Sequence, residues 1–217
     1  RALRPFDAER FPEQLRELLA LSEGGFPEGH PFHGIRVIPQ GVSLPPVWVL
    51  GSSGASARLA GELGVGYGFA SHFSPTPAAP ALEAYRKAFR PTGRHPAPHV
   101  ILGVSVICAE TDAEADRLAT SMDLGWVRLR RGIHAPLPTP EEAGAHPFTP
   151  AERALVRQYR ELTVVGSPET VRDSLEDLWH RTVADEFMVM TMIHDPEARL
   201  HSHRLLAATL AEQPVAP

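Results

Sequence analysis

The sequence lacks several features that mark large classes of proteins. It contains one cysteine, Cys108, among 217 residues, so no disulfide bond can form within the chain. It has no run of about 20 apolar residues, the length that a membrane-spanning helix needs. It also lacks a basic excess, because 21 Lys and Arg residues face 26 Asp and Glu residues and the net charge is −5. We therefore predict a cytoplasmic protein that binds neither a membrane nor nucleic acid.

The residues that are present are typical of a folded α/β domain. Hydrophobic residues make up 43% and charged residues 22% of the chain, which are ordinary values for a globular protein. Short apolar stretches alternate with segments of helical periodicity, a pattern that favours a sheet covered by helices. We interpret residues 1–217 as one domain with four convincing strands, at residues 47–50, 67–70, 100–108 and 187–191. A further short apolar stretch at 164–166 leads into the next helix.

Local signals mark where several helices begin and end. Gly64 is a stop signal for the helix that precedes it. Thr111 and Glu114 have the spacing of a capping box, in which each residue satisfies a backbone N–H group of the other. Ser167 as N-cap and Pro168 at the first helical position predict a further helix start.

The most informative segment joins the first strand to the helix after it. Residues 47–50 are apolar throughout, so we expect a strand that is buried on both faces. After Gly51 come residues that offer hydroxyl or free backbone N–H groups where a helix begins: Ser52, Ser53, Gly54 and Ser56. The dipole of a helix favours an anion at this end, so the corner is suited to a phosphate. An ordinary capped turn explains the same residues, since serine is a favoured N-cap.

A family resemblance distinguishes these two interpretations. The motifs that carry it are Leu-Gly-Ser-Ser-Gly at 50–54, Gly-Phe-Ala-Ser-His-Phe-Ser-Pro at 68–75, Val-Gly-Ser-Pro-Glu-Thr-Val at 165–171, Asp-Glu-Phe-Met-Val-Met-Thr at 185–191 and Arg-Leu-His-Ser-His-Arg-Leu-Leu at 199–206. The sequence resembles the bacterial-luciferase-like flavin-dependent monooxygenases, in the carboxyl-terminal part of their barrel. The resemblance covers nearly the whole chain.

The resemblance implies a partial TIM (β/α)8 barrel whose amino-terminal strands would precede Arg1. It also implies an oxidoreductase that uses reduced FMN, or in some members a deazaflavin, with O2 to oxidise an organic substrate. The sequence does not name that substrate. By position, Ser53 and Ser56 match the family's phosphate-binding hydroxyls, with Ser52 and Gly54 beside them. Ala70 and Ser71 match the strand end near the flavin ring.

Two further features are candidates for function. His72 follows the second strand, at the carboxyl end where barrel enzymes place their sites, and His194 follows the last strand in the same way. A structural, hydrogen-bonded histidine is the alternative interpretation of both. The proline-rich residues 132–150 form a long loop, which in a compact domain is typically a functional lid or a disordered segment. We expect no metal site, because His201 and His203 are two residues apart on a helix and do not face one way.

Two other classes of function stay open. A serine hydrolase would use Ser53 as nucleophile, Asp185 as acid and His194 as base, although the fifth position of its Gly-x-Ser-x-Gly motif is Ala55. A half-barrel could also bind flavin, or simply dimerise, without turnover. Half a barrel exposes two sheet edges, and unpaired edges favour association. We therefore expect a homodimer or pairing with a missing amino-terminal half.

Overall fold

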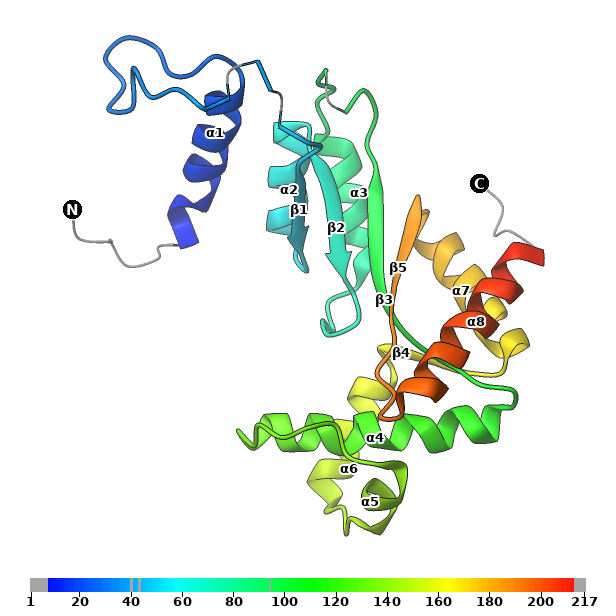
Figure 1. The fold of residues 1–217 in the computed structure, drawn as a ribbon. Coiled ribbons are helices and arrows are strands. Elements are labelled where there is room, and N and C mark those ends of the chain that lie inside the picture. The colour runs from blue at the N-terminus through cyan, green and yellow to red at the C-terminus, as the bar shows by residue number, and fades with distance from the viewer. Residues whose placement is uncertain (1–7, 40, 43, 94, 213–217) are drawn as a thin grey trace.

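The computed structural model describes residues 8–39, 41–42, 44–93 and 95–212, which form alternating strands and helices (Figure 1). A short 3-10 turn (η1, Ala8–Arg10) and α1 (Phe11–Ser22) precede the sheet. The elements that follow are β1 (Trp48–Gly51), α2 (Gly54–Leu63), β2 (Gly66–Ala70), α3 (Ala78–Ala88), β3 (Val100–Cys108), α4 (Asp112–Arg130), α5 (Pro140–Ala145), α6 (Pro150–Arg160), β4 (Thr163–Gly166), α7 (Pro168–Thr182), β5 (Glu186–Met190) and α8 (Pro196–Glu212).

All strand pairs are parallel, and β3 is the centre of the sheet. β1 pairs with β2, and β2 pairs with β3 from Val100 to Gly103. The long β3 also pairs with β5, from Ile101 to Ser105, and with the short β4, from Ser105 to Cys108. The sheet therefore has five strands in the described part of the chain, and not the four that we counted from the sequence. The additional strand is short, and only two of its four residues are apolar.

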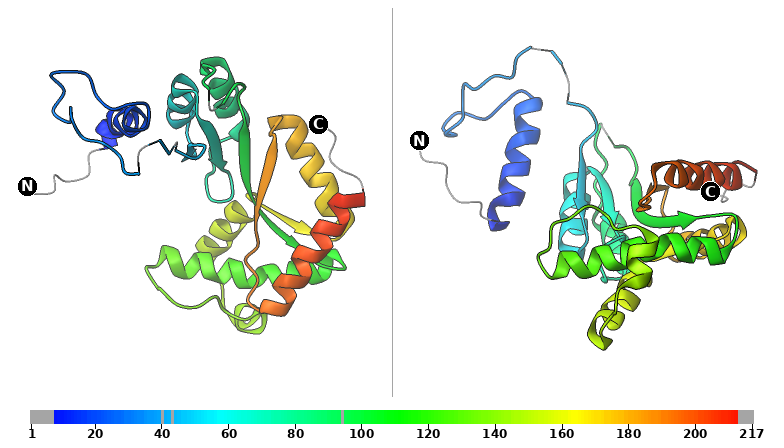
Figure 2. Two further views of the ribbon diagram at one scale, coloured as in Figure 1. Left: turned by 45° about the horizontal axis from the view of Figure 1, so that its top comes forward. Right: turned by 60° about the horizontal axis from the view of Figure 1, so that its bottom comes forward.

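The helices α2, α3, α7 and α8 lie along one face of the sheet (Figure 2), where the main hydrophobic core forms. The prediction that residues 47–50 are buried on both faces is wrong. Val49 packs in this core, whereas the side chain of Leu50 points to the other face and is 76% exposed. Met188 of β5 is 62% exposed in the same way. Among the described residues no helix covers Leu50 and Met188 on this second face. Nearer the end of β3, however, Ile107 packs against Ala115 and Leu118 of α4 in a second hydrophobic cluster, so both faces are buried there.

The predicted helix signals lie at helix ends. Gly64 has the left-handed conformation of a C-cap, with φ 59°, which glycine adopts at little cost. The hydroxyl oxygen of Ser167 accepts the Thr170 N–H at the start of α7. Local sequence therefore predicts both boundaries. Distant residues add to them, since the Ser167 N–H donates to the Asp112 carboxylate at 2.7 Å and the Thr92 hydroxyl donates to the Gly64 carbonyl oxygen at 3.0 Å.

The predicted capping box at the start of α4 is only half formed. Thr111 caps the helix by accepting the Glu114 N–H, but the carboxylate of Glu114 binds the Arg117 guanidinium at 2.8 Å. A complete capping box forms instead at α6, where Thr149 and Glu152 satisfy each other's backbone N–H groups. The difference has a simple cause, since Arg117 lies one turn along α4 and its charge competes for the carboxylate.

Cys108 is 1% exposed in the core, and burial raises the pKa of its thiol to about 11. Because the thiolate is the reactive form, we expect the folded protein not to react with a thiol reagent at pH 8. The same protein in concentrated denaturant is expected to react once per chain. With an aromatic disulfide as the thiol reagent, the absorbance of the thiolate that the reagent releases measures both reactions. Rapid labelling of the folded protein would contradict this description of the core.

Among the described residues no helix combines the length and the apolar composition that crossing a membrane requires. The same residues contain no group of three or more His, Cys, Asp or Glu side chains that could hold a metal ion.

Candidate functional site

The turn between β1 and α2 presents backbone donors to an open space. Ser53 has an extended backbone (φ −142°, ψ 157°), and its hydroxyl oxygen lies 3.4 Å from the Ser56 nitrogen, so it is the N-cap of α2. Helix geometry leaves the N–H groups of Gly54 and Ala55 without an intrahelical acceptor. A Cβ added at Gly54 would meet no atom within 4 Å. The corner can therefore admit an anion in front of the first turn of α2.

Behind this turn, a buried tyrosine from β2 completes a hydrogen-bonded cluster. Ser56 Oγ lies 2.9 Å from the Ser53 carbonyl oxygen and 2.9 Å from Tyr67 Oη, which is itself 3.2 Å from that carbonyl oxygen. Gly51 makes the contact possible, because a Cβ there would lie 2.1 Å from Ser56 Oγ. Burial raises the pKa of the fully buried Tyr67 hydroxyl. Tyr67 therefore keeps its proton at neutral pH and can donate it to the serine turn.

The structure brings the predicted phosphate residues together. The hydroxyl oxygens of Ser53 and Ser56 are 3.2 Å apart. Gly54 is the first residue of α2, and Ser52 lies between the end of β1 and the N-cap. Sequence reasoning did not single out Tyr67, because an aromatic residue within an apolar strand is typical of a core position. Only the pairing of β1 with β2 places its hydroxyl beneath the turn.

An apolar cavity of about 590 Å³ lies on the face of the sheet that carries Leu50 and Met188. Its walls are formed by four strands, β1, β2, β3 and β5, and by His72 beyond the end of β2. The lining residues are Trp48, Val49, Leu50, Gly68, Phe69, Ala70, His72, Ile101, Gly103, Met188, Val189 and Met190. Leu50 is followed directly by Gly51, where the serine turn begins. The strand β1 therefore lines the cavity and leads directly into the anion corner.

The two residues predicted to border a flavin ring face different spaces. Ala70 lines the apolar cavity. Ser71 lines a second cavity of about 350 Å³ between β3, β4, α3 and α7, and its hydroxyl donates to the Gly103 carbonyl oxygen at 2.6 Å. The difference arises because neighbouring residues at a strand end project in opposite directions. The side chain of Ser71 is thus engaged in a contact away from the apolar cavity.

His72 is the titratable side chain of the apolar cavity, which it enters from the end of β2. Its Nδ1 atom is buried and has no hydrogen-bond partner among the described residues. A Cβ added at Gly103 would lie 3.0 Å from this atom, so the glycine makes room for the imidazole. A buried polar atom without a partner is costly, which makes Nδ1 available to a bound ligand.

The residues of the alternative hydrolase triad are not brought together. Ser53 follows the carboxyl end of β1, whereas Asp185 precedes the amino end of β5 and accepts the Val100 N–H at 2.7 Å. The two residues thus lie at opposite ends of a parallel sheet. The third residue, His194, contacts the Leu137 carbonyl oxygen through Nδ1 at 2.7 Å. The geometry gives no support to a serine nucleophile assisted by this acid and this base.

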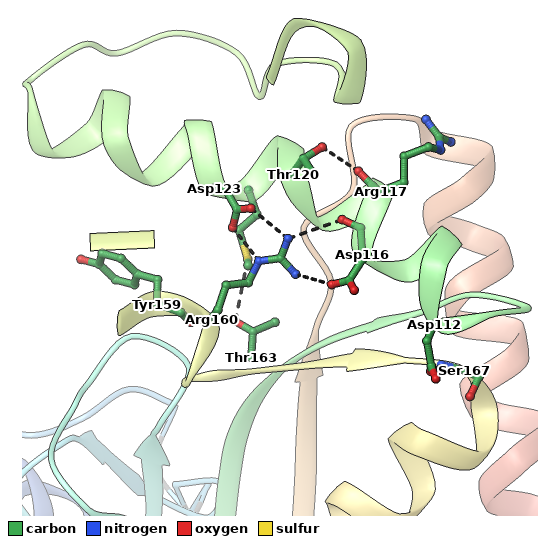
Figure 3. A network of polar contacts seen from close by, with 10 residues as sticks. Asp112, Asp116, Arg117, Thr120, Asp123, Tyr159, Arg160, Thr163 and Ser167 are labelled. Atoms are coloured by element: carbon green, nitrogen blue, oxygen red, sulfur yellow. Dashed lines mark hydrogen bonds and ion pairs between the residues drawn. The ribbon is translucent and has the colours of Figure 1, made fainter. Parts of the chain in front are cut away.

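Residues 132–150, predicted as a continuous loop, contain the helix α5, whose N-cap is Thr139. An ion-pair network holds the following helix, α6, against α4 (Figure 3). Arg160 of α6 binds both carboxylate oxygens of Asp123 at 2.7 and 2.8 Å and contacts the Asp116 carboxylate at 3.2 Å. Tyr159 stacks on Trp126 of α4 with ring centroids 4.1 Å apart. The segment is therefore attached at its α6 end to the helix from which it departs.

Comparison with known proteins identifies the family. A family model described as luciferase-like monooxygenase matches residues 4–186. The chain is 42% identical over 200 residues to YvbT of Bacillus subtilis (strain 168), and 37% identical over 199 residues to a luciferase-like monooxygenase of Escherichia coli (strain K12). Each match covers 92% of this chain and 58% of the relative. The chain thus spans less than two thirds of the length of these relatives.

Solved structures agree in fold. The structure of apo-MsnO8 has a TM-score of 0.81 and 34% identity, over 97% of this chain and 63% of that one. The FMN complex of the oxygenating constituent of 3,6-diketocamphane monooxygenase, from Pseudomonas putida, has a TM-score of 0.51 and 24% identity, over 81% and 50% of the two chains. These likenesses confirm the partial (β/α)8 barrel expected from the sequence. The chain belongs to the luciferase-like monooxygenase family.

Proposed function

We propose that this chain carries the cofactor site of a monooxygenase that uses reduced FMN and O2 to oxidise a small organic substrate. One observation supports the proposal most strongly: a donor-lined anion corner and an apolar cavity adjoin at the carboxyl end of β1. FMN has this combination, a phosphate joined by a ribityl chain to a flat ring system. Parallel-sheet enzymes place their ligands at this end of the strands.

The residues present fit such a cofactor. At the corner, the space in front of Gly54 is open, and the N–H groups of the first turn have no intrahelical acceptor. In the cavity, Leu50 and Met188 supply exposed apolar surface that a ring system would cover. The unpartnered Nδ1 of His72 offers one polar contact to the edge of a ring. A deazaflavin shares the phosphate and the ring shape, so it is the alternative occupant.

The chain's own share of the reaction is binding and exclusion of water. When bound, reduced FMN would supply two electrons to O2, so that one oxygen atom enters the substrate and the other leaves as water. Ser52, Ser53, Gly54 and Ser56 would hold the phosphate, and Ala70 would border the ring. His72 would accept or donate one hydrogen bond through Nδ1, and the apolar walls would keep water from the reacting atoms.

We propose that residues 132–150 act as a lid over the substrate. Their first part, with the end of α4 and Met192 beyond β5, lines a further cavity of about 420 Å³. Met192 follows β5, the strand that supplies Met190 to the apolar cavity. A substrate in this third cavity would therefore lie beside the proposed ring site. The lining is mainly apolar and includes Trp126, Leu129 and Ile133, which suits an apolar substrate.

We also propose that the sheet edges pair with another polypeptide, either a second copy or a separate amino-terminal half. Among the described residues, β1 pairs only with β2, and β5 pairs only with β3. Each of these strands therefore has one edge whose N–H and C=O groups are unpaired, and such edges associate readily. Closing the barrel would also cover the apolar face that Leu50 and Met188 leave exposed.

The phosphate assignment predicts the effect of removing two hydroxyls. We expect the Ser53→Ala/Ser56→Ala variant to bind FMN about tenfold more weakly or worse, because each hydrogen bond to a charged group contributes roughly 1.5–3 kcal/mol. The start of α7 offers a matched control, since Ser167 caps Thr170 N at 3.4 Å and the two side-chain oxygens are 3.1 Å apart. We expect Ser167→Ala/Thr170→Ala to lose a helix cap without losing FMN affinity. Fluorescence titration measures both, and unchanged affinity in the first variant would refute the assignment.

A further inference from the structure

We propose that Tyr67 is a positioning residue of the phosphate corner. Its hydroxyl donates a hydrogen bond to the Ser53 carbonyl oxygen when the Ser56 hydroxyl donates to a phosphate oxygen instead. The inference rests on the proposed function, because it assumes that an anion binds in front of α2. It concerns a residue that touches neither the anion space nor the apolar cavity. Tyr67 would act entirely through Ser56.

The argument begins with three oxygen atoms that lie within hydrogen-bond distance of one another. Ser56 Oγ is 2.9 Å from the Ser53 carbonyl oxygen, and Tyr67 Oη is 2.9 Å from Ser56 Oγ and 3.2 Å from that carbonyl oxygen. The Ala57 N–H also donates to the Ser53 carbonyl oxygen, at 3.2 Å. A carbonyl oxygen has two lone pairs, so one is left for a hydroxyl proton. Ser56 and Tyr67 therefore compete for one acceptor.

The two ways of satisfying this acceptor differ in what the corner offers to an anion. If Ser56 donates to the carbonyl oxygen, Tyr67 donates to Ser56 Oγ. The Ser56 hydroxyl then presents only lone pairs, and no proton, to a bound anion. If Tyr67 donates to the carbonyl, the Ser56 proton is free to point at a phosphate oxygen. Every buried hydroxyl keeps a partner in both arrangements. Only rotations of two hydroxyl groups separate them, and no proton leaves its oxygen.

The surroundings of Tyr67 hold it in this role. The side chain is fully buried, and its ring packs against Phe69 and Tyr85 with centroid distances of 6.4 and 5.5 Å. Gly51 leaves the space that lets the serine and tyrosine oxygens meet. Burial raises the pKa of the Tyr67 hydroxyl, so it remains a donor throughout the neutral range. No other hydrogen bond of this hydroxyl is found among the described residues.

The test compares FMN with riboflavin, which has the same ring and lacks the phosphate. We expect Tyr67→Phe to lower the affinity for FMN about tenfold, the loss of one charge-assisted hydrogen bond, and to leave the affinity for riboflavin unchanged. Ser56→Ala is expected to lower the FMN affinity by a similar factor. Because both variants remove the same contact, the double variant is expected to lose little more than either single variant. Fluorescence titration gives all the affinities.

Tyr85→Phe is a matched control. Tyr85 is also fully buried, and its hydroxyl donates to the Val65 carbonyl oxygen at 3.0 Å and accepts the His99 N–H at 3.1 Å. It does not contact the serine turn, so we expect it to change stability and not the ratio of the two affinities.

Three outcomes would overturn the inference. A Tyr67→Phe variant that keeps the unaltered protein's preference for FMN overturns it while the proposed function stands. A Ser56→Ala variant that keeps this preference for FMN also overturns the inference and leaves the proposed function standing. This second variant decides the question if Tyr67→Phe does not fold. If the unaltered protein binds FMN no better than riboflavin, the phosphate corner itself is refuted.

Discussion

Replacement of Gly54 by aspartate is expected to lower the affinity for FMN about 100-fold and to leave riboflavin binding unchanged. The new carboxylate would stand in the open space in front of the first turn of α2, where we place the phosphate. Two like charges at about 4 Å repel by roughly 1 kcal/mol in water and roughly 4 kcal/mol near a protein surface. The backbone at Gly54 does not have a positive φ, so a side chain is tolerated there. Fluorescence titration with both ligands measures the effect.

The same substitution is expected to stabilise the fold slightly, which separates binding from folding. An acidic residue in the first turn of a helix contributes about 0.3–1 kcal/mol through the helix dipole. Gly54→Asn is the matched control, because it has nearly the same shape without the charge. We expect the asparagine variant to keep most of the FMN affinity. Equal FMN affinities of the aspartate and asparagine variants would show that no phosphate binds at this corner.

Replacement of Arg160 by methionine is expected to lower the free energy of unfolding by about 3 kcal/mol, because it leaves a buried carboxylate without its partner. Asp123 is 8% exposed, and Arg160 is its ion-pair partner in the network of Figure 3. The stem of methionine keeps the apolar contacts of the arginine side chain. The decrease in the free energy of unfolding therefore reflects mainly the removed charge. Urea unfolding followed by circular dichroism measures the change.

Two further variants show whether this loss comes from the unpaired charge. The double variant Asp123→Leu/Arg160→Met removes both charges and is expected to regain most of the lost stability. Asp116→Ala removes a partner of Arg160 whose side chain is 73% exposed, and it is expected to cost about 0.5 kcal/mol or less. If Arg160→Met costs no more than Asp116→Ala, the network does not hold α6 against α4.

This attachment limits how the proposed lid can move. α4 and α6 are joined by the Arg160 network and by the stacked rings of Trp126 and Tyr159. Within α6, Glu152 accepts from the backbone of Thr149 and forms an ion pair with Arg131 at 2.7 Å, which holds the end of α4 to the start of α6. A lid motion that opens the third cavity would then involve residues 132–139 more than α6.

Sequence reasoning was most successful where a short segment determines its own structure. The stop at Gly64 and the cap at Ser167 depend on residues within one helical turn, and both lie where they were expected. The serine turn after β1 is another local feature, and it forms an N-cap that leaves its first N–H groups free. The family resemblance, which rests on contiguous motifs, was confirmed by the family model.

The errors concern properties that depend on distant segments. The apolar stretch 47–50 gave no sign that the side chain of Leu50 would be 76% exposed on the second face of the sheet. The role of Tyr67 follows from the pairing of β1 with β2, which brings together residues 11 positions apart. The acid and base of the hydrolase alternative had the right order in the chain, but strand direction places Asp185 at the opposite end of the sheet from Ser53.

The most direct test of the account is a titration of the unaltered protein with FMN and with riboflavin, with the oligomeric state recorded by light scattering in the same sample. We expect micromolar binding of FMN, at least about tenfold weaker binding of riboflavin, and a mass larger than that of one chain. A folded protein that binds neither ligand, or binds both equally, would contradict the assignment of the serine turn and the adjoining cavity as a flavin phosphate and ring site.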